Sequence, residues 1–168
     1  MFVPFESLPL NARVWIVQAD RRLSTEELSI VHEQLRKFTE EWSVHGAPLP
    51  TSYSIQFDQF ILLAADESQQ GASGCSIDSS VRALKTLGQT LNVDLFDRNK
   101  IAFKIDQDIV LVPLPEIKQK FRDGILTEGT LTFNNLVDTR EAWKNNWIVP
   151  AGATWLKRYI TNPLANVK

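Results

Sequence analysis

The sequence contains only one cysteine and two histidines among its 168 residues. A single cysteine cannot form a disulfide within the chain, so nothing in the sequence indicates an oxidising compartment. Two histidines and one cysteine are also too few soft ligands for a dedicated zinc site. We therefore expect no metal site and no cofactor.

Long apolar runs are missing as well. The longest, Phe60 to Ala65, is far shorter than the roughly 20 residues that a membrane-spanning helix needs. The first ten residues, MFVPFESLPL, have no basic segment and contain two prolines, which is not the pattern of a signal peptide. We therefore expect a cytoplasmic protein with no membrane partner.

A large net charge and a nucleotide-binding motif are also absent. The net charge is −2, which provides no general electrostatic attraction for a nucleic acid. No G-x-x-x-x-G-K-[ST] sequence is present, and this excludes a phosphate-binding loop of the common ATPase type.

The sequence does contain a regular series of strand and helix patterns. Residues 11–20 are rich in β-branched and aromatic side chains and predict a buried strand. Ser24 and Glu27 then have the spacing of a capping box, and a helix is predicted to run on toward a stop at Gly46. The apolar face of this helix recurs every three or four residues, at Leu28, Val31, Leu35, Phe38 and Trp42.

Two predicted hairpins flank a second helix. Residues 52–57 and 60–66 predict the first hairpin, although one long kinked strand fits the same residues. The helix follows from Ser76 or Asp78 to Leu91, and residues 101–106 and 109–114 predict the second hairpin. Residues 115–124 begin as a third helix and stop at a glycine.

The order β-α-β-β-α-β-β-α predicts an α+β fold. Its first six elements, βαββαβ, match the ferredoxin-like pattern, in which two helices pack on one face of an antiparallel sheet. An open α/β sheet is the alternative, and the two hairpins disfavour it. We expect a single domain over residues 1–168, with a core over about residues 10–124 and a C-terminal helical or irregular extension over about residues 125–168.

This topology brings the cysteine to the same end of the sheet as a histidine and two acidic residues. If the first strand runs upward, the first helix descends and ends with His45. The third strand descends to Asp66 and Glu67, and the second helix starts beside Cys75. The candidate catalytic residues are therefore Cys75, His45, Asp66 and Glu67.

These residue types suit a reaction of a thiol. A helix N-terminus favours a thiolate, a histidine can act as the base, and Asp66 or Glu67 can orient the imidazole ring. Backbone amides can stabilise an oxyanion, and small residues around Cys75 leave room for a ligand. The candidate binding residues are Gly71, Ser73, Gly74, Ser76 and Ile77.

The first functional hypothesis is therefore a ligand or thiol site in the Gly71–Ser76 loop, with Cys-dependent acyl or thiol transfer as its reaction. The ligand is an unknown small molecule or protein. The alternative is that Cys75 is a small, inert packing residue, that His45 is a helix-end histidine bonded to a free carbonyl, and that Asp66 and Glu67 form a solvated turn.

The C-terminal third differs from the rest in charge and in tryptophan content. Residues 115–168 contain eight basic and five acidic residues, against ten and fifteen in residues 1–114, and they include Trp143, Trp147 and Trp155. Exposed tryptophans mark interfaces, so the second hypothesis is a non-catalytic interaction module that forms a homodimer through this segment. Tryptophans that anchor the tail to the core are the alternative. Binding of single-stranded nucleic acid is disfavoured, because no strand has the aromatic pattern of the RNA-binding version of this fold.

Four stretches of the sequence resemble a known family. VWIVQADR, EEWSVHGAPL, DQFILLAADES and ASGCSIDSSVRALKTLG are similar to an uncharacterised family of small Bacteroidetes-type proteins that are often labelled "ABC transporter ATPase". The phosphate-binding loop and the transporter signature that this label requires are both missing. The resemblance therefore implies a bacterial, cytoplasmic setting and no particular activity.

Overall fold

The structure is a computed structural model that describes residues 1–44, 46–69 and 74–160. The chain divides into two compact units. The first consists of Met1–Phe96 and Asn135–Asn145, and the second of Asp97–Asn134 and Asn146–Lys168.

An antiparallel sheet of three strands forms the centre of the first unit, as far as its residues are described. The strands are β1 (Arg13–Gln18), β4 (Thr51–Gln56) and β5 (Phe60–Ala65), in the spatial order β1-β5-β4. β4 and β5 pair from Thr51↔Ala65 to Gln56↔Phe60 and so form the first predicted hairpin. The short strands β2 (Ser43–Val44) and β3 (Ala47–Pro48) pair with each other ahead of β4.

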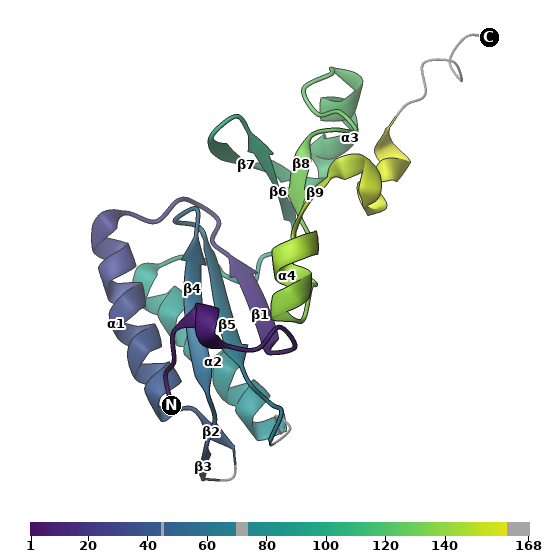
Figure 1. Ribbon diagram of the computed structural model, residues 1–168. Coiled ribbons are helices and arrows are strands. Elements are labelled where there is room, and N and C mark those ends of the chain that lie inside the picture. Colours follow the sequence, from purple (N-terminus) through teal and green to yellow (C-terminus); the bar gives the residue numbers. More distant parts are fainter. Residues whose placement is uncertain (45, 70–73, 161–168) are drawn as a thin grey trace, which may run out of the picture. The chain divides into compact units, whose positions relative to one another are not determined.

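Two helices cover one face of this sheet. α1 (Thr25–Glu41) and α2 (Gly74–Leu91) contact each other, and Figure 1 shows α1 beside the strands and α2 behind them. The strand side chains that pack against them come from odd-numbered positions, as the two-residue period of a strand requires. These side chains are Trp15, Val17, Tyr53, Ile55, Ile61, Leu63 and Ala65.

The N-terminus of α1 has the predicted capping box. Ser24 Oγ accepts a hydrogen bond from the Glu27 backbone N–H at 3.2 Å, and the Glu27 carboxylate accepts one from the Ser24 N–H at 3.0 Å. Val31 and Leu35 of the predicted apolar face are buried in the core between helix and sheet, and Trp42, which directly follows the helix, is buried in the same core. The prediction of this helix face is therefore confirmed.

A different part of the chain covers the opposite face of the sheet. The short helix η1 (Phe5–Ser7) contacts β4, and in Figure 1 it lies in front of the strands. The Phe5 ring meets the Trp143 ring of α4 (Arg140–Asn146) edge-on at 5.3 Å. Arg140 donates hydrogen bonds to the Leu8 carbonyl at 3.0 Å and to the Glu6 carboxylate at 2.8 Å. Trp143 is thus a packing residue that fixes α4 to the N-terminal segment.

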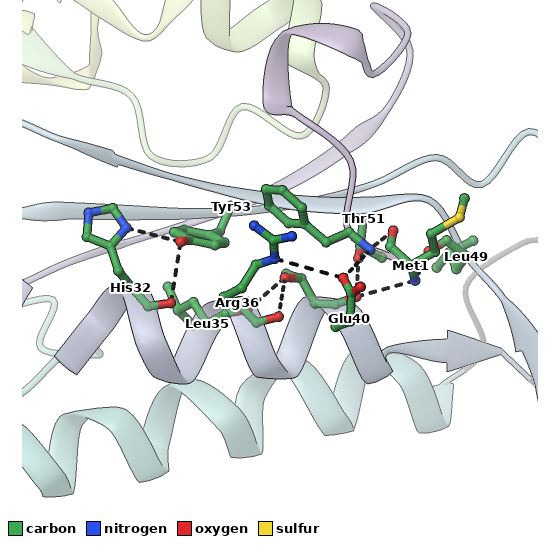
Figure 2. Close-up of polar contacts among 10 residues, drawn as sticks. Met1, His32, Leu35, Arg36, Glu40, Leu49, Thr51 and Tyr53 are labelled. Atoms are coloured by element: carbon green, nitrogen blue, oxygen red, sulfur yellow. Dashed lines mark hydrogen bonds and ion pairs between the residues drawn. The ribbon is translucent and has the colours of Figure 1, made fainter. Parts of the chain in front are cut away.

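The first two residues are held against α1 and β4 (Figure 2). The Met1 nitrogen donates to the Leu49 carbonyl at 2.9 Å, and the Phe2 N–H donates to the Glu40 carboxylate at 3.1 Å. The Arg36 guanidinium lies over the Phe2 ring at 3.8 Å. These contacts keep the C-terminal half of α1 close to the start of β4.

The second unit contains its own antiparallel sheet. Within the described residues, β6 (Lys100–Ile105), β7 (Asp108–Pro113), β8 (Leu131–Phe133) and β9 (Ile148–Pro150) are arranged in the order β7-β6-β8-β9. The described part of this unit also contains α3 (Leu114–Arg122) and two short helices, η2 (Ala151–Ala153) and η3 (Trp155–Tyr159). Its core contains Phe103, Val112, Ile117, Phe121, Leu126, Ala151 and Leu156.

The predicted α+β class is confirmed, but the ferredoxin-like arrangement is not. The sixth element, β6, pairs with β7 and β8 in the second unit and not with the sheet of the first. A fourth strand could join that sheet only at an outer edge, and other segments occupy both edges. Val14 N–H donates to the Asp138 carbonyl at 3.0 Å beside β1, and Val3 N–H donates to the Thr51 carbonyl at 2.8 Å beside β4.

Gly88 in α2 allows a close approach of the backbone. A Cβ at this position would lie 2.8 Å from the Val93 carbonyl oxygen, which is a clash with an atom that cannot rotate away. We predict that Gly88→Ala lowers the free energy of unfolding by about 1–2 kcal/mol, because the clash outweighs the higher helix propensity of alanine. Urea unfolding measures this change. Gly129→Ala is the control, since its nearest atom would be 4.0 Å away, and equal effects of the two substitutions would refute the explanation.

Glu27 makes the stability of the first unit sensitive to acid. Two hydrogen bonds from Arg21, at 2.7 Å each, together with that from the Ser24 backbone, lower the pKa of Glu27 from 4.5 to about 2. A carboxyl group whose pKa is lower in the folded state stabilises the protein above pH 4.5, and this contribution is lost as the pH falls toward 2.

We therefore predict that Glu27→Gln destabilises the protein at pH 6 and has a much smaller effect near pH 2. Urea unfolding at a series of pH values measures both. Glu26→Gln is the matched control, since Glu26 is exposed and lies outside the capping box. A destabilisation by Glu27→Gln that is the same at every pH would contradict the prediction.

Candidate functional site

Cys75 is the second residue of α2, which begins at Gly74. The helix therefore starts slightly earlier than the predicted Ser76 or Asp78, and the backbone of Cys75 lies in its first turn together with Ser76 and Ile77. Gly71 and Ser73 lie outside the described residues, and the side chains of residues 74–76 are not described.

His45 also lies outside the described residues. The helix that was predicted to end with it ends earlier, at Glu41, and Trp42 has the extended backbone angles φ −67° and ψ 120°. The prediction that this helix runs to position 45 is therefore wrong. Ser43 and Val44 instead form β2, and Gly46 has φ +78°, the left-handed conformation that tight hairpin turns require.

Asp66 and Glu67 follow directly after β5 and differ in their surroundings. The Asp66 N–H donates to the Pro50 carbonyl at 2.8 Å, and Asp66 Oδ1 accepts from the Ser68 N–H at 2.9 Å. Glu67 Oε1 is buried and has no hydrogen-bond partner among the described residues. Asp66 therefore stabilises its own turn, whereas Glu67 presents an unused acceptor.

The ends of four elements meet at one end of the first unit. The last residue of β5, Ala65, pairs with Thr51, the first residue of β4. Thr51 Oγ1 in turn donates to the Thr39 carbonyl near the end of α1, at 2.6 Å. α2 starts at the same end, where it contacts β2 (Figure 1). This is the arrangement of chain ends that the order β-α-β-β-α predicts.

A groove of about 360 Å³ runs between α1 and α2. Its lining comes from both helices: α1 contributes Gln34, Leu35, Lys37, Phe38 and Glu41, and α2 contributes Ser79, Arg82, Ala83 and Thr86. The volume lies within the range of small-molecule sites, which are roughly 300–1,000 Å³.

The groove has an apolar floor and a charged rim. Leu35 is buried, Phe38 and Ala83 are half-buried, and Lys37, Glu41 and Arg82 are exposed. None of these three charged side chains forms an ion pair or hydrogen bond within the described ranges. Such a lining can hold an apolar body and orient a charged group at its edge.

The same face of α2 leads from the groove to Cys75. Positions 79, 82, 83 and 86 share one face of a helix of 3.6 residues per turn, and position 75 lies on it one turn before Ser79. The sequence prediction missed this groove. The signal was present in Gln34, Lys37, Phe38 and Glu41, whose spacing forms a second stripe beside the apolar face of α1.

A larger hollow, of about 580 Å³, lies at the other end of α2. Its floor contains the buried residues Leu84, Val93 and Leu95. One wall is the turn after the helix, in which Asp94 Oδ1 accepts a hydrogen bond from the Phe96 N–H at 2.8 Å. Because that carboxylate already holds the turn and the hollow lies far along α2 from Cys75, we attribute the hollow to the packing of this turn.

Within the described ranges, no helix combines the length and apolar character needed to cross a membrane. The same residues contain no group of three or more histidine, cysteine, aspartate or glutamate side chains placed to hold a metal ion. Comparisons of the chain with protein-family models, with curated proteins and with solved structures find no match.

Proposed function

We propose that this protein binds a small ligand along the face of α2 that begins at Cys75, and that Cys75 is the nucleophile of an acyl- or thiol-transfer reaction. The observation that carries the proposal is the start of α2 at Gly74, which puts Cys75 in the first turn of a helix whose same face lines the groove. The setting we propose is the bacterial cytoplasm, in line with the sequence resemblance.

The first turn of a helix favours an anionic sulfur. The backbone N–H groups there have no partner within the helix, and the helix dipole is positive at this end. Thiols in this position have a lower pKa than the usual 8.5 or so of free cysteine. The amides of Ser76 and Ile77 belong to the same turn and are the proposed donors to an oxyanion.

In the proposed acyl transfer, the substrate is a thioester or an ester. His45 takes the proton from the Cys75 thiol, and the sulfur forms a bond to the acyl carbonyl carbon. The carbonyl oxygen gains negative charge and then re-forms its double bond as the bond to the leaving thiolate or alkoxide breaks. The imidazolium of His45 gives its proton to that leaving group.

Glu67 is the better candidate than Asp66 for orienting His45. Asp66 Oδ1 already accepts the Ser68 N–H, whereas Glu67 Oε1 is buried and lacks a partner among the described residues. A buried carboxylate oxygen without a donor costs free energy, and the ring N–H of a histidine would supply one. Glu67 is therefore proposed as a positioning residue and Asp66 as a structural one.

Alkylation of the native protein tests this proposal, because Cys75 is the only thiol. We predict half-maximal reaction with iodoacetamide below about pH 8.5. We also predict that N-hexylmaleimide reacts faster than N-methylmaleimide, since the groove would hold the hexyl chain beside the thiol.

Ala83→Leu fills the groove and should abolish the advantage of the hexyl reagent while leaving the methyl rate unchanged. N-methylmaleimide serves as the internal control for accessibility of the sulfur. A thiol that stays inert until pH 8.5 or above would contradict the proposed reaction at Cys75. Equal rates for the two maleimides would contradict the proposal that the thiol lies beside the groove.

A second candidate function is dimerisation through the tryptophan-bearing segment. Trp143 packs on Phe5, and Trp147 is buried against Phe133, with 4.9 Å between their ring centroids, so these two act as anchors. Trp155 is different, because 46% of its side chain is exposed at the start of η3. The dimer hypothesis therefore depends on Trp155.

We predict that light scattering gives about twice the monomer mass of 19.1 kDa for the wild-type protein and the monomer mass for Trp155→Ser. The large apolar area of tryptophan is the physical reason. Phe57→Ser is the control, since Phe57 is an exposed aromatic residue of the first unit. A wild-type protein that is monomeric at every concentration would eliminate this candidate.

A further inference from the structure

The groove between α1 and α2 combines an apolar floor with two cations that have no acidic partner in the described part of the chain. We infer that it binds an amphipathic anion, namely an unbranched hydrocarbon chain that ends in a carboxylate. The chain lies on Phe38 and Ala83, and the carboxylate is held by Lys37 and Arg82. This inference concerns the groove itself and does not depend on the reactivity of Cys75.

The floor of the groove suits a narrow apolar group. Phe38 of α1 and the small side chain of Ala83 of α2 both line the groove, and the Phe38 ring packs against the Trp42 ring at a centroid distance of 5.0 Å. Phe38 and Ala83 are both half-buried, so part of their apolar surface is exposed to water. Covering that surface with a hydrocarbon chain is favourable, because it removes apolar area from water.

The length of the groove limits the ligand to a short chain. At one end, Gln34 Nε2 donates to Thr90 Oγ1 at 3.5 Å, which links α1 to α2. From Gln34 to Glu41 the groove follows eight residues of α1, which rise by about 10 Å along the helix axis. A helical peptide needs a longer surface for its anchor residues, whereas an extended medium-length acyl chain fits.

The charges on the rim select an anion. Lys37 comes from α1 and Arg82 from α2, so one cation stands on each side of the groove, with Glu41 as the single acidic residue of the lining. Elsewhere on the first unit, Arg21 pairs with Glu27 at 2.7 Å and Arg36 with Glu40 at 3.9 Å. Lys37 and Arg82 have no such pairing within the described ranges, and a guanidinium can hold a carboxylate through two parallel hydrogen bonds.

Binding of octanoate, 1-octanol and octylamine to the full chain tests the inference. The readout is the change in amide chemical shifts during a titration followed by NMR. We expect octanoate to shift the amides of residues 34–41 and 79–86 and to bind more tightly than octanol, with octylamine the weakest. Lys37→Gln and Arg82→Gln should each weaken octanoate about threefold, and the double variant about tenfold.

Lys85→Gln is the matched control, because it removes an exposed cation from the same helix outside the groove, and octanoate should bind this variant as it binds the wild type. Equal binding of octanoate and octanol, shifts that lie elsewhere, or an unchanged affinity in the double variant would each overturn the inference. Cys75→Ser keeps octanoate binding in this scheme but loses the thiol reaction. Failure of the thiol proposal and failure of the anion site are therefore seen in separate measurements.

Discussion

The complete burial of β5 is the constraint on which the first unit depends. All six of its residues, Phe60–Ala65, are inaccessible to solvent, although the strand belongs to an antiparallel sheet. A strand buried on both faces requires cover on both sides and a partner at each edge. The amphipathic helices α1 and α2 cover one face of the sheet, and η1 contributes to the cover of the opposite face. Because α1 and α2 both lie over the odd-numbered side chains of a narrow sheet, they contact each other, and the groove lies between them.

Local periodicity predicted the helices and strands well, because the spacing of apolar residues within a segment reflects which of its faces is buried. Spacing alone predicted the capping box and apolar face of α1, both hairpins, and α2. The sheet to which β6 belongs could not be predicted in this way, because the sheet that a strand joins depends on residues far away in the chain. Asp138 and Val3 hydrogen-bond to the two outer strands of the first sheet. The sequence of residues 100–105 contains no pattern from which these occupied edges could be predicted. The end of α1 was misplaced for a similar reason, since the pairing of Ser43 with Pro48 overrides the helical pattern there.

Some features of the candidate site could be predicted from the sequence, and others could not. The meeting of the ends of α1 and β5 with the start of α2 follows from element order, so it could be predicted without coordinates. The difference between Asp66 and Glu67 could not, because it depends on which N–H groups surround each carboxylate. The groove could not be predicted from the sequence either, since its position depends on which faces of α1 and α2 meet. That Ala83 and Phe38 line the same groove becomes apparent only once the two helices are known to be neighbours.

The charges near the start of α2 decide whether a reactive thiol is possible there. The positive end of a helix stabilises an anion by about 0.3–1 kcal/mol at an exposed site. A carboxylate such as Glu67 at the same end opposes a second anion, and no hydrogen-bond donor in the described residues offsets the charge at its Oε1. The helix alone therefore does not guarantee a thiolate at Cys75. A cation placed between the two anions removes the conflict, because it attracts both and separates them. An imidazolium that pairs with the sulfur on one side and with Glu67 on the other meets this requirement, so the proposed thiol chemistry needs the histidine as well as the positive end of the helix.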